Sequence, residues 1–329
     1  MSTATLNKPT TGTPPVRRTL PGADGLVWTM SRLHRPALWV WTAYTAITLG
    51  LLLWLWGPGA STAQKAFDTF GYAGTQDDAW KGLGNGLPLV GSTFNTLFYD
   101  PATMISIAAC AIAVFAAGPL IARELESGTA QLAWTQSVTP ARWLAAKLAL
   151  PALLVTASTA VIVVLYRAVW DSNNHLLLAG IGPRAFNFSI GPATVATALF
   201  AVAFGVLVGL VVRRTLPAVV VAGVTQYLVG AARGNNWPFQ GLHPQPELPV
   251  HSKAITSTGA QISDPGCYLD KACLAKHDIV GFTRSYLPSP DYWPRQLAET
   301  GILLALTALA VAAAFLVLRR HTPRRSTSV

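Results

Sequence analysis

The sequence predicts an all-α polytopic membrane protein with six transmembrane helices and both termini in the cytoplasm. Three observations support this fold class. Long apolar runs recur along the 329 residues, of which 51% are hydrophobic. Only 12% of the residues are charged, well below the roughly 25% of an average soluble domain. Lys and Arg residues gather in the segments on one side of the apolar runs. We therefore expect a lipid bilayer to surround most of the chain.

The segment that precedes the first apolar run is polar. Residues 1–24 are rich in Thr, Pro and Arg, which predicts a disordered cytoplasmic tail. Asp24 can cap a helix, and Leu26, Met30 and Leu33 then recur at helical spacing among basic residues. This pattern favours an interfacial amphipathic helix, with a frayed start to the first span as the alternative. The first apolar run begins too late for a cleavable signal peptide, so we interpret it as a span.

Six apolar segments are long enough to cross a bilayer, for which about 20 helical residues suffice. The predicted spans are 37–56, 101–122, 144–166, 189–212, 215–232 and 296–318. The segments 57–100, 167–188 and 233–295 are interpreted as outer loops. Residues 25–318 would thus form one six-span domain, and the basic residues 319–329 a cytoplasmic tail.

Proline and glycine residues predict where the spans begin, bend and pack. Pro101 suits the first turn of a helix, and Pro151 predicts a kink in the third span. Gly205 and Gly209 lie four residues apart in the fourth span. A pair of small residues at this spacing lets two helices approach closely, so we expect tight packing on this face.

The distribution of basic residues predicts the orientation. Fourteen of the 24 Lys and Arg residues lie on the side of the termini: five before span 1, three around the segment between spans 2 and 3, two between spans 4 and 5, and four in the tail. Three acidic residues accompany them, whereas the opposite side has ten residues of each sign. The positive-inside rule then places the termini in the cytoplasm. The net charge of +10 follows from this topology and does not indicate nucleic-acid binding.

The segment between spans 2 and 3 is the most polar short stretch between two apolar runs. Gly128 should break the helix that continues from span 2, and Thr129 can cap a short helix over 130–136. Thr139 followed by Pro140 is a second start signal, a cap residue and then proline at the first helical position. We therefore predict a short transverse helix at the cytoplasmic tip of two spans.

Side chains on this hairpin suit contact with another protein. Leu132 and Trp134 would give the short helix an apolar surface, and Glu124 and Glu126 would offer carboxylates to basic residues of a partner. A push on such a helix would move both spans together. An ordinary loop anchored at the interface by its Trp residues is the alternative.

The order of residues in the hairpin resembles that of the membrane (permease) subunits of type-2 ATP-binding-cassette exporters. The residues that carry the resemblance are Arg123, Glu124, Glu126, Gly128, Thr129, Leu132, Pro140 and Lys147. Six spans with both termini inside, an interfacial elbow helix before the first span and a long outer loop before the last span fit the same family. The Ala-, Arg-, Pro- and Trp-rich composition is similar to that of actinobacterial members.

The resemblance implies a function and a set of partners. A separate ATP-binding-cassette ATPase subunit would bind ATP and magnesium, so that this chain binds no cofactor and catalyses no reaction. The short helix would be the coupling helix between the two subunits. Two permeases, as a homodimer or heterodimer, would export an apolar or amphipathic substrate (a drug, an antibiotic or a lipid-like molecule) through the bacterial plasma membrane. The coupling residues would be Arg123, Glu124, Glu126, Gly128, Thr129, Leu132 and Trp134.

Four further residues are candidates for other roles. Cys267 and Cys273 lie in an outer loop, where oxidising conditions permit a disulfide; two unpaired thiols are the alternative. Gln226 lies near the middle of span 5 and Glu299 in the first turn of span 6. Both are candidates for a translocation path, although a helix-to-helix hydrogen bond for Gln226 and a tolerated interfacial carboxylate for Glu299 are the more common roles.

Two other function classes remain as alternatives. A membrane-embedded enzyme acting on lipid would need an outer active site, for which the 233–295 segment offers His243, His251, Asp264 and Asp270. An ion-driven secondary transporter usually has repeats and interrupted, charged spans, and the sequence has neither. Residues 86–93 mimic a phosphate-binding loop but have Ser92 where that motif requires Lys. The six histidines show no metal-ligand spacing.

Overall fold

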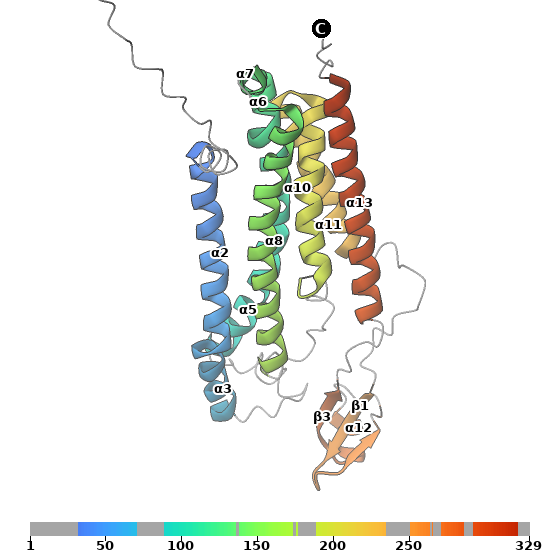
Figure 1. The fold of residues 1–329 in the computed structure, drawn as a ribbon. Helices are drawn as coiled ribbons and strands as arrows, with labels where there is room; N and C mark the ends of the chain where they lie inside the picture. Colours follow the sequence, from blue (N-terminus) through green and yellow to red (C-terminus); the bar gives the residue numbers. More distant parts are fainter. Residues whose placement is uncertain are drawn as a thin grey trace, which may run out of the picture.

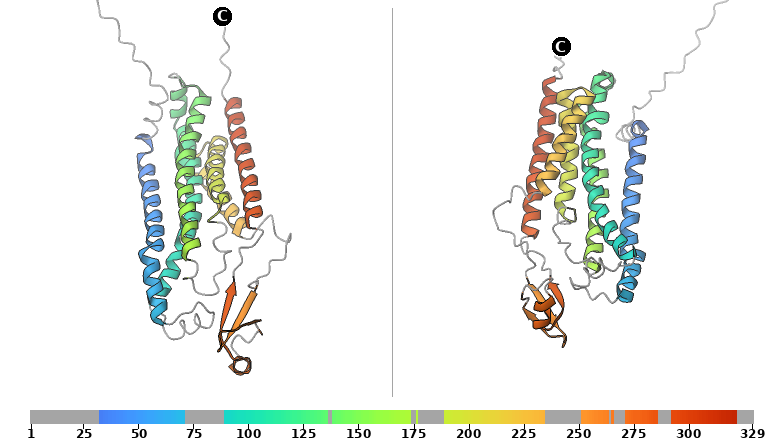
Figure 2. Two further views of the ribbon diagram at one scale, coloured as in Figure 1. Left: turned by 60° about the horizontal axis from the view of Figure 1, so that its bottom comes forward. Right: turned by 180° about the vertical axis from the view of Figure 1, so that it is seen from behind.

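Six long helical segments form the body of the molecule and confirm the predicted fold class. The computed structural model describes residues 32–70, 89–135, 138–173, 176, 189–234, 251–263, 265, 271–285 and 292–321. Six helical segments in these ranges are long and apolar enough to cross a membrane. They stand side by side as a bundle (Figures 1 and 2).

The elements follow each other in the order of the sequence. The helices are α2 (Arg35–Trp56), α3 (Pro58–Phe70), α5 (Leu89–Ala117), α6 (Arg123–Glu126), α7 (Thr129–Thr135), α8 (Pro140–Asn173), α10 (Pro192–Val212), α11 (Thr215–Gly234), α12 (Lys271–Lys276) and α13 (Tyr292–His321). A π-helical turn, η1 (Gly118–Ala122), joins α5 to α6. The strands are β1 (His251–Thr256), β2 (Gln261–Ser263) and β3 (Ile279–Ser285).

Helix α10 lies at the centre of the bundle. It packs against α5, α8, α11 and α13, and 67% of its most apolar stretch is buried, compared with 17–22% for the spans that contain α2, α8, α11 and α13. The outer helices expose large apolar side chains instead, among them Val164 on α8 and Leu216 on α11. This inverted pattern is expected where lipid rather than water covers the outside.

The predicted close packing at Gly205 and Gly209 is present between α10 and α5. A Cβ atom on Gly205 would lie 2.6 Å from the carbonyl oxygen of Ala113, and one on Gly209 would lie 2.6 Å from that of Ala117. Both distances are shorter than van der Waals contact. The two helix backbones therefore touch along this face only because neither residue has a side chain.

Residues 58–70 and 89–100 are helical, although they fall in the segment 57–100 that the sequence predicts as a loop. Helix α3 follows α2 directly after Gly57, and α5 begins at Leu89, so that Pro101 lies inside α5 instead of at its start. The cause is a buried cluster in which Phe94 and Phe98 pack against Leu52, Leu55 and the end of α8. A prediction from the apolar run alone missed residues 89–100 of this helix because polar residues, among them Asn95 and Asp100, interrupt its apolar ones.

The remaining spans differ from the predictions mainly at their ends. Helix α8 extends seven residues beyond 166, and α13 begins four residues before 296. Polar residues at these positions shortened the predicted spans, although helices commonly continue beyond the hydrocarbon core. Pro151 lies inside the continuous α8. The predicted elbow helix and both terminal tails fall almost wholly outside the described residues.

A small antiparallel sheet lies beyond the end of the bundle that is opposite α6 and α7 (Figure 1). Its strand order is β2-β1-β3, and the β1–β2 turn contains Gly259 at a φ of 79°. This sheet and α12 lie in the segment that was predicted as a loop. The short strands do not alternate clearly in the sequence, which is why the sheet was missed.

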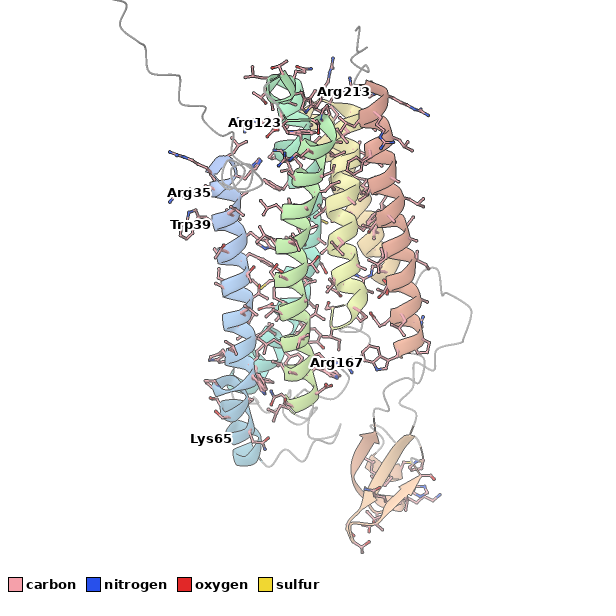
Figure 3. All side chains as sticks on the ribbon, viewed as in Figure 1. Arg35, Trp39, Lys65, Arg123, Arg167 and Arg213 are labelled. Carbon is pink, nitrogen blue, oxygen red and sulfur yellow. The ribbon has the colours of Figure 1, made fainter. Side chains whose placement is uncertain are left out.

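The two ends of the bundle carry the basic residues. Arg35, Arg123 and Arg213 lie at the end formed by α6 and α7, whereas Lys65 and Arg167 lie at the opposite end (Figure 3). Helix α2 begins and α13 ends at the α6–α7 end (Figure 1). The hairpin and both ends of the six-helix unit therefore share one face.

Candidate functional site

The hairpin between α5 and α8 contains the predicted short helix. Helix α7 covers Thr129–Thr135, which agrees with the predicted 130–136 except that Gln136 lies outside the described residues. The chain turns between α6 and α7 at Gly128, whose φ is 76°, a conformation that favours glycine. At the other end, the backbone N–H of Arg142 donates a hydrogen bond to Thr139 Oγ1 at 3.3 Å, as predicted for the cap of α8.

Thr129 has a different local role from the one predicted. It is the first residue of α7 and not its cap. Its hydroxyl donates a hydrogen bond to the carbonyl oxygen of Glu124 at 3.3 Å and lies 3.0 Å from the hydroxyl of Ser127. Thr129 thus closes the end of α6, because the last carbonyls of a helix have no partner within it.

The Glu124 carboxylate contacts residues of its own chain. This differs from the prediction that it is offered to a partner. Its Oε1 atom lies 2.5 Å from Nζ of Lys147, and its Oε2 atom accepts a hydrogen bond from the indole N–H of Trp143 at 3.2 Å. Lys147 is 3% exposed and Glu124 15% exposed. Lys147 and Trp143 of α8 therefore connect this helix to α6. The carboxylate also compensates the charge of the buried Lys147 ammonium group.

His34 extends this network to the start of α2. Its Nε2 atom lies 3.3 Å from Nζ of Lys147, and its ring packs edge-on against Phe115 at 5.5 Å. Burial, with the nearby charge of Lys147, lowers the pKa of His34, and the charge of Glu124 opposes this only partly. The neutral imidazole can accept a hydrogen bond from Lys147. The sequence carries no local signal for this contact because 113 positions separate the two residues.

Glu126 is likewise occupied within the chain. Its Oε2 atom accepts hydrogen bonds from the backbone N–H of Thr215 at 2.9 Å and from the Thr215 hydroxyl at 2.6 Å. Thr215 is the first residue of α11, so that Glu126 caps this helix from outside. The carboxylate therefore connects the hairpin to α11.

The faces of α7 differ in character. Ala130 is fully buried in a cluster with Trp143 and Leu144 of α8, and Trp134 packs edge-on against Trp143 at 5.6 Å. Leu132 is not part of this cluster and is 59% exposed. Arg123 at the start of α6 is also exposed. Helix α7 is thus fixed on one side and presents an apolar residue on the other.

Gln226 and Glu299 lie in different surroundings. Gln226 is 2% exposed and lines a cavity within the bundle, and its Oε1 atom has no hydrogen-bond partner among the described residues. Glu299 forms an ion pair with Arg233 of α11. Because α13 begins at Tyr292, Glu299 lies in its second turn and not at its start. Among the described residues, Gln226 Oε1 therefore does not form the hydrogen bond to a neighbouring helix that is common for a glutamine within a span.

The outer cysteines are only partly described. Cys273 on α12 is disulfide-bonded, and Cys110 on α5 is free. Cys267 lies outside the described residues, so its pairing with Cys273 stays a prediction.

The sites required by the alternative functions find no support among the described residues. No group of His, Cys, Asp and Glu residues suited to a metal ion occurs in these parts of the chain. Of the four raw candidates for an outer active site, His251 falls in β1, while His243, Asp264 and Asp270 lie outside the described residues. Of residues 86–93, which mimic a phosphate-binding motif, 89–93 form the start of α5 and 86–88 lie outside the described residues.

Comparison with known proteins agrees with the six-span bundle and its hairpin. A family model described as ABC-2 membrane transporter related matches residues 42–234, which include α5, the hairpin, α8, α10 and α11. No curated protein matches the chain. Members of this family are multi-pass proteins, in bacteria of the cell membrane, and they work with a partner ATP-binding subunit. The chain belongs to the ABC-2 membrane transporter related family and is an ABC transporter permease subunit.

Proposed function

We propose that this permease subunit exports an apolar or amphipathic substrate from the cell, driven by ATP hydrolysis on a separate subunit. The substrate class comprises drugs, antibiotics and lipid-like molecules. Two permeases, most simply two copies of this chain, would assemble with two ATPases, which bind the ATP and magnesium. The observation that supports this proposal best is α7, a short helix that packs against α8 through Ala130 and exposes Leu132.

Each attachment of the hairpin would transmit a displacement of α7. Ala130 and Trp134 contact α8, the Glu124–Lys147 pair connects α6 to α8, and Glu126 holds the start of α11. A force on α7 would therefore act on α5, α8 and α11 together, as in a rigid-body transition.

The predicted coupling residues divide into two groups in this proposal. Arg123 and Leu132 are exposed and would contact the ATPase. Glu124, Glu126, Gly128, Thr129 and Trp134 would instead fix the position of α7, because their contacts lie within the chain.

The test is co-purification of the permease with the ATPase encoded by a neighbouring reading frame. We expect Leu132→Ala to weaken this association about tenfold or more, because apolar anchors carry much of the energy of an interface. Leu153→Ala is the matched control, since Leu153 is 70% exposed on α8 and lies within a predicted span. Retention of the ATPase by Leu132→Ala would contradict the proposed contact.

Transport direction needs a separate measurement. Inside-out vesicles that contain both subunits should accumulate an amphipathic fluorescent dye only when ATP is present. Accumulation without ATP, or with the permease alone, would contradict an ATP-driven exporter.

A further inference from the structure

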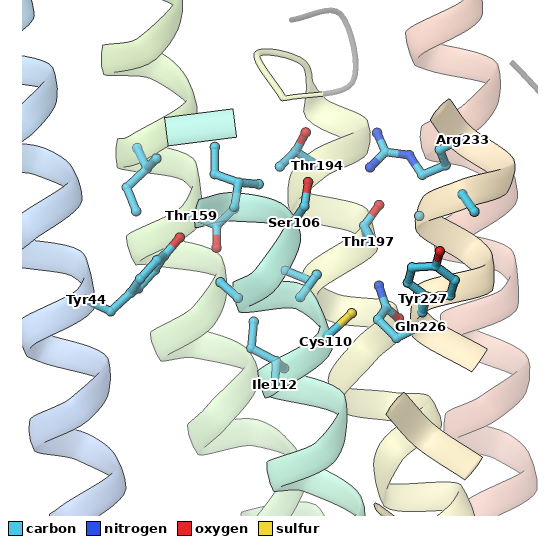
Figure 4. A pocket seen from close by; sticks show the side chains of 17 residues that line it. Tyr44, Ser106, Cys110, Ile112, Thr159, Thr194, Thr197, Gln226, Tyr227 and Arg233 are labelled. Atoms are coloured by element: carbon cyan, nitrogen blue, oxygen red, sulfur yellow. The ribbon is translucent and has the colours of Figure 1, made fainter. Parts of the chain in front are cut away.

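A cavity of about 330 Å³ lies within the bundle, between α2, α5, α8, α10 and α11 (Figure 4). Thr194 near the start of α10 and Arg233 near the end of α11 line it. Both positions are at the helix ends opposite the hairpin. Cavities of this size hold small molecules, and the depth of the site in the bundle separates it from the proposed ATPase contact.

The lining is mainly apolar, with a few polar groups at fixed positions. Alanine and isoleucine side chains form much of the wall, together with Ser106, Thr159 and Thr197. The hydroxyl of Ser106 donates to the carbonyl oxygen of Ala102 at 3.0 Å, and that of Thr197 to the carbonyl oxygen of Ala193 at 2.8 Å. Since these protons are already used, the hydroxyl oxygens face a ligand as acceptors.

Gln226 supplies the polar group that most requires a ligand. Its side chain lies on the cavity wall across from Tyr44, beside Cys110 (Figure 4). Gln226 is 2% exposed, and its Oε1 atom has no partner among the described residues. A buried carbonyl oxygen without a hydrogen bond is unfavourable, so a bound donor would stabilise this arrangement.

The cavity has no net charge to offer a ligand. Arg233 is the only Lys, Arg, Asp or Glu among the described residues that line the cavity, and it forms an ion pair with Glu299 of α13. An anion would have to compete with this carboxylate, and a cation would meet no free carboxylate among the lining residues. Because transfer of an unpaired charge into such surroundings is costly, an uncharged ligand is favoured.

We propose that this cavity binds a small uncharged amphipathic molecule whose hydroxyl or primary amide donates a hydrogen bond to Gln226 Oε1. Its apolar part would fill the space between α5 and α10. That the bound molecule is also the transported substrate rests on the proposed function; the binding itself does not.

Photolabelling tests the proposal directly. The probe is decanol with a mid-chain diazirine, applied to the full-length chain in lipid nanodiscs, and labelled peptides are identified by mass spectrometry. We expect labels on α5 and α11 around Cys110 and Gln226. Decanol should compete with the probe, whereas decyl methyl ether, decanoate and decylamine should compete about five- to tenfold less well, as expected for a lost hydrogen bond or a buried charge.

Two glutamine variants give a matched comparison. Gln226→Leu should reduce labelling about five- to tenfold. Gln296→Leu removes an equally buried amide, which accepts a hydrogen bond from the backbone N–H of Ala193 at 3.4 Å and does not line the cavity, so labelling should remain. The competition by alcohol and ether in the unchanged protein keeps the test decisive even if a variant fails to fold.

The outcomes separate this site from the proposed function. Equal competition by decanol and its methyl ether would overturn the proposal, because an apolar chain alone would then account for binding. Absence of label from α5 and α11 would also overturn it, even if ATP-driven transport is observed. Labelling that depends on Gln226, in a protein that shows no ATP-driven transport, would support the site while contradicting the exporter.

Discussion

Glu124 and Lys147 show how a few polar residues hold the hairpin. Lys147 is almost fully buried, and its charge is compensated by one carboxylate, with His34 as a further hydrogen-bond partner. Such a pair is not by itself strongly stabilising, because desolvation offsets the attraction. Loss of one member is costly, however, since it leaves the other charge buried without compensation.

We therefore expect Glu124→Gln to destabilise the subunit by about 3–5 kcal/mol. Replacing both residues, as Glu124→Gln with Lys147→Met, should recover part of this loss because no buried charge remains. Asp171→Asn is the control: it removes an exposed ion pair with Arg167 at 3.6 Å and should change stability by less than about 1 kcal/mol. The measurement is the denaturation midpoint of the purified subunit. Equal effects of Glu124→Gln and Asp171→Asn would show that the buried pair is unimportant.

Helix α10 depends on its small residues for its central position. It contacts four other helices, and its glycines let α5 approach at backbone distance. In a bilayer, packing contacts between helices replace much of the hydrophobic driving force that a soluble core has. The geometry of this one helix pair therefore affects the arrangement of the whole bundle.

We expect Gly209→Ala to destabilise the bundle by about 1–3 kcal/mol, because the new methyl group would overlap the α5 backbone. Gly50→Ala on α2 makes the same chemical change where nothing lies within 4 Å of the new atom. This control should be neutral or stabilise by about 0.5–1 kcal/mol through helix propensity. Thermal unfolding in lipid would measure both, and a Gly209→Ala protein as stable as Gly50→Ala would contradict the packing argument.

The molecule as a whole has two chemically different ends. The hairpin, the start of α2 and the end of α13 share one end, and the β-sheet lies beyond the other (Figures 1 and 2). The positive-inside rule predicts that the hairpin end faces the cytoplasm. The two proposals place the ATPase contact at this end and the ligand cavity toward the other end. Helices α5 and α11 line the cavity and extend to the hairpin end.

Cysteine labelling in intact cells tests this orientation. In a Cys110→Ala background, Lys276→Cys on α12 should react with a membrane-impermeant maleimide, because Lys276 is exposed and predicted to face outward. Gln131→Cys on α7 is exposed as well but should react only after permeabilisation. The reverse pattern would place the hairpin outside and would remove the basis for an ATPase contact there.

The sequence alone determined the six spans and the short helix of the hairpin, whereas the orientation stays a prediction. These features depend on local signals: apolar length, Gly128 as a helix break, and Thr139 with Pro140 as a helix start. The sequence also predicted the close approach at Gly205 and Gly209, because the spacing of small residues lies within one helix. Family membership, found by comparison, agrees with the resemblance of the hairpin.

Only the tertiary structure decided which side chains meet across the bundle. The Glu124–Lys147–His34 contacts, the Glu126–Thr215 hydrogen bonds and the Arg233–Glu299 pair join residues of different elements that lie 23 to 113 positions apart in the chain. Residue type and spacing do not encode such contacts, since they depend on how the helices rotate and pack. For the same reason the sequence did not show that the Glu124 carboxylate is largely buried, that the exposed Glu126 binds Thr215, or that Gln226 lines a cavity.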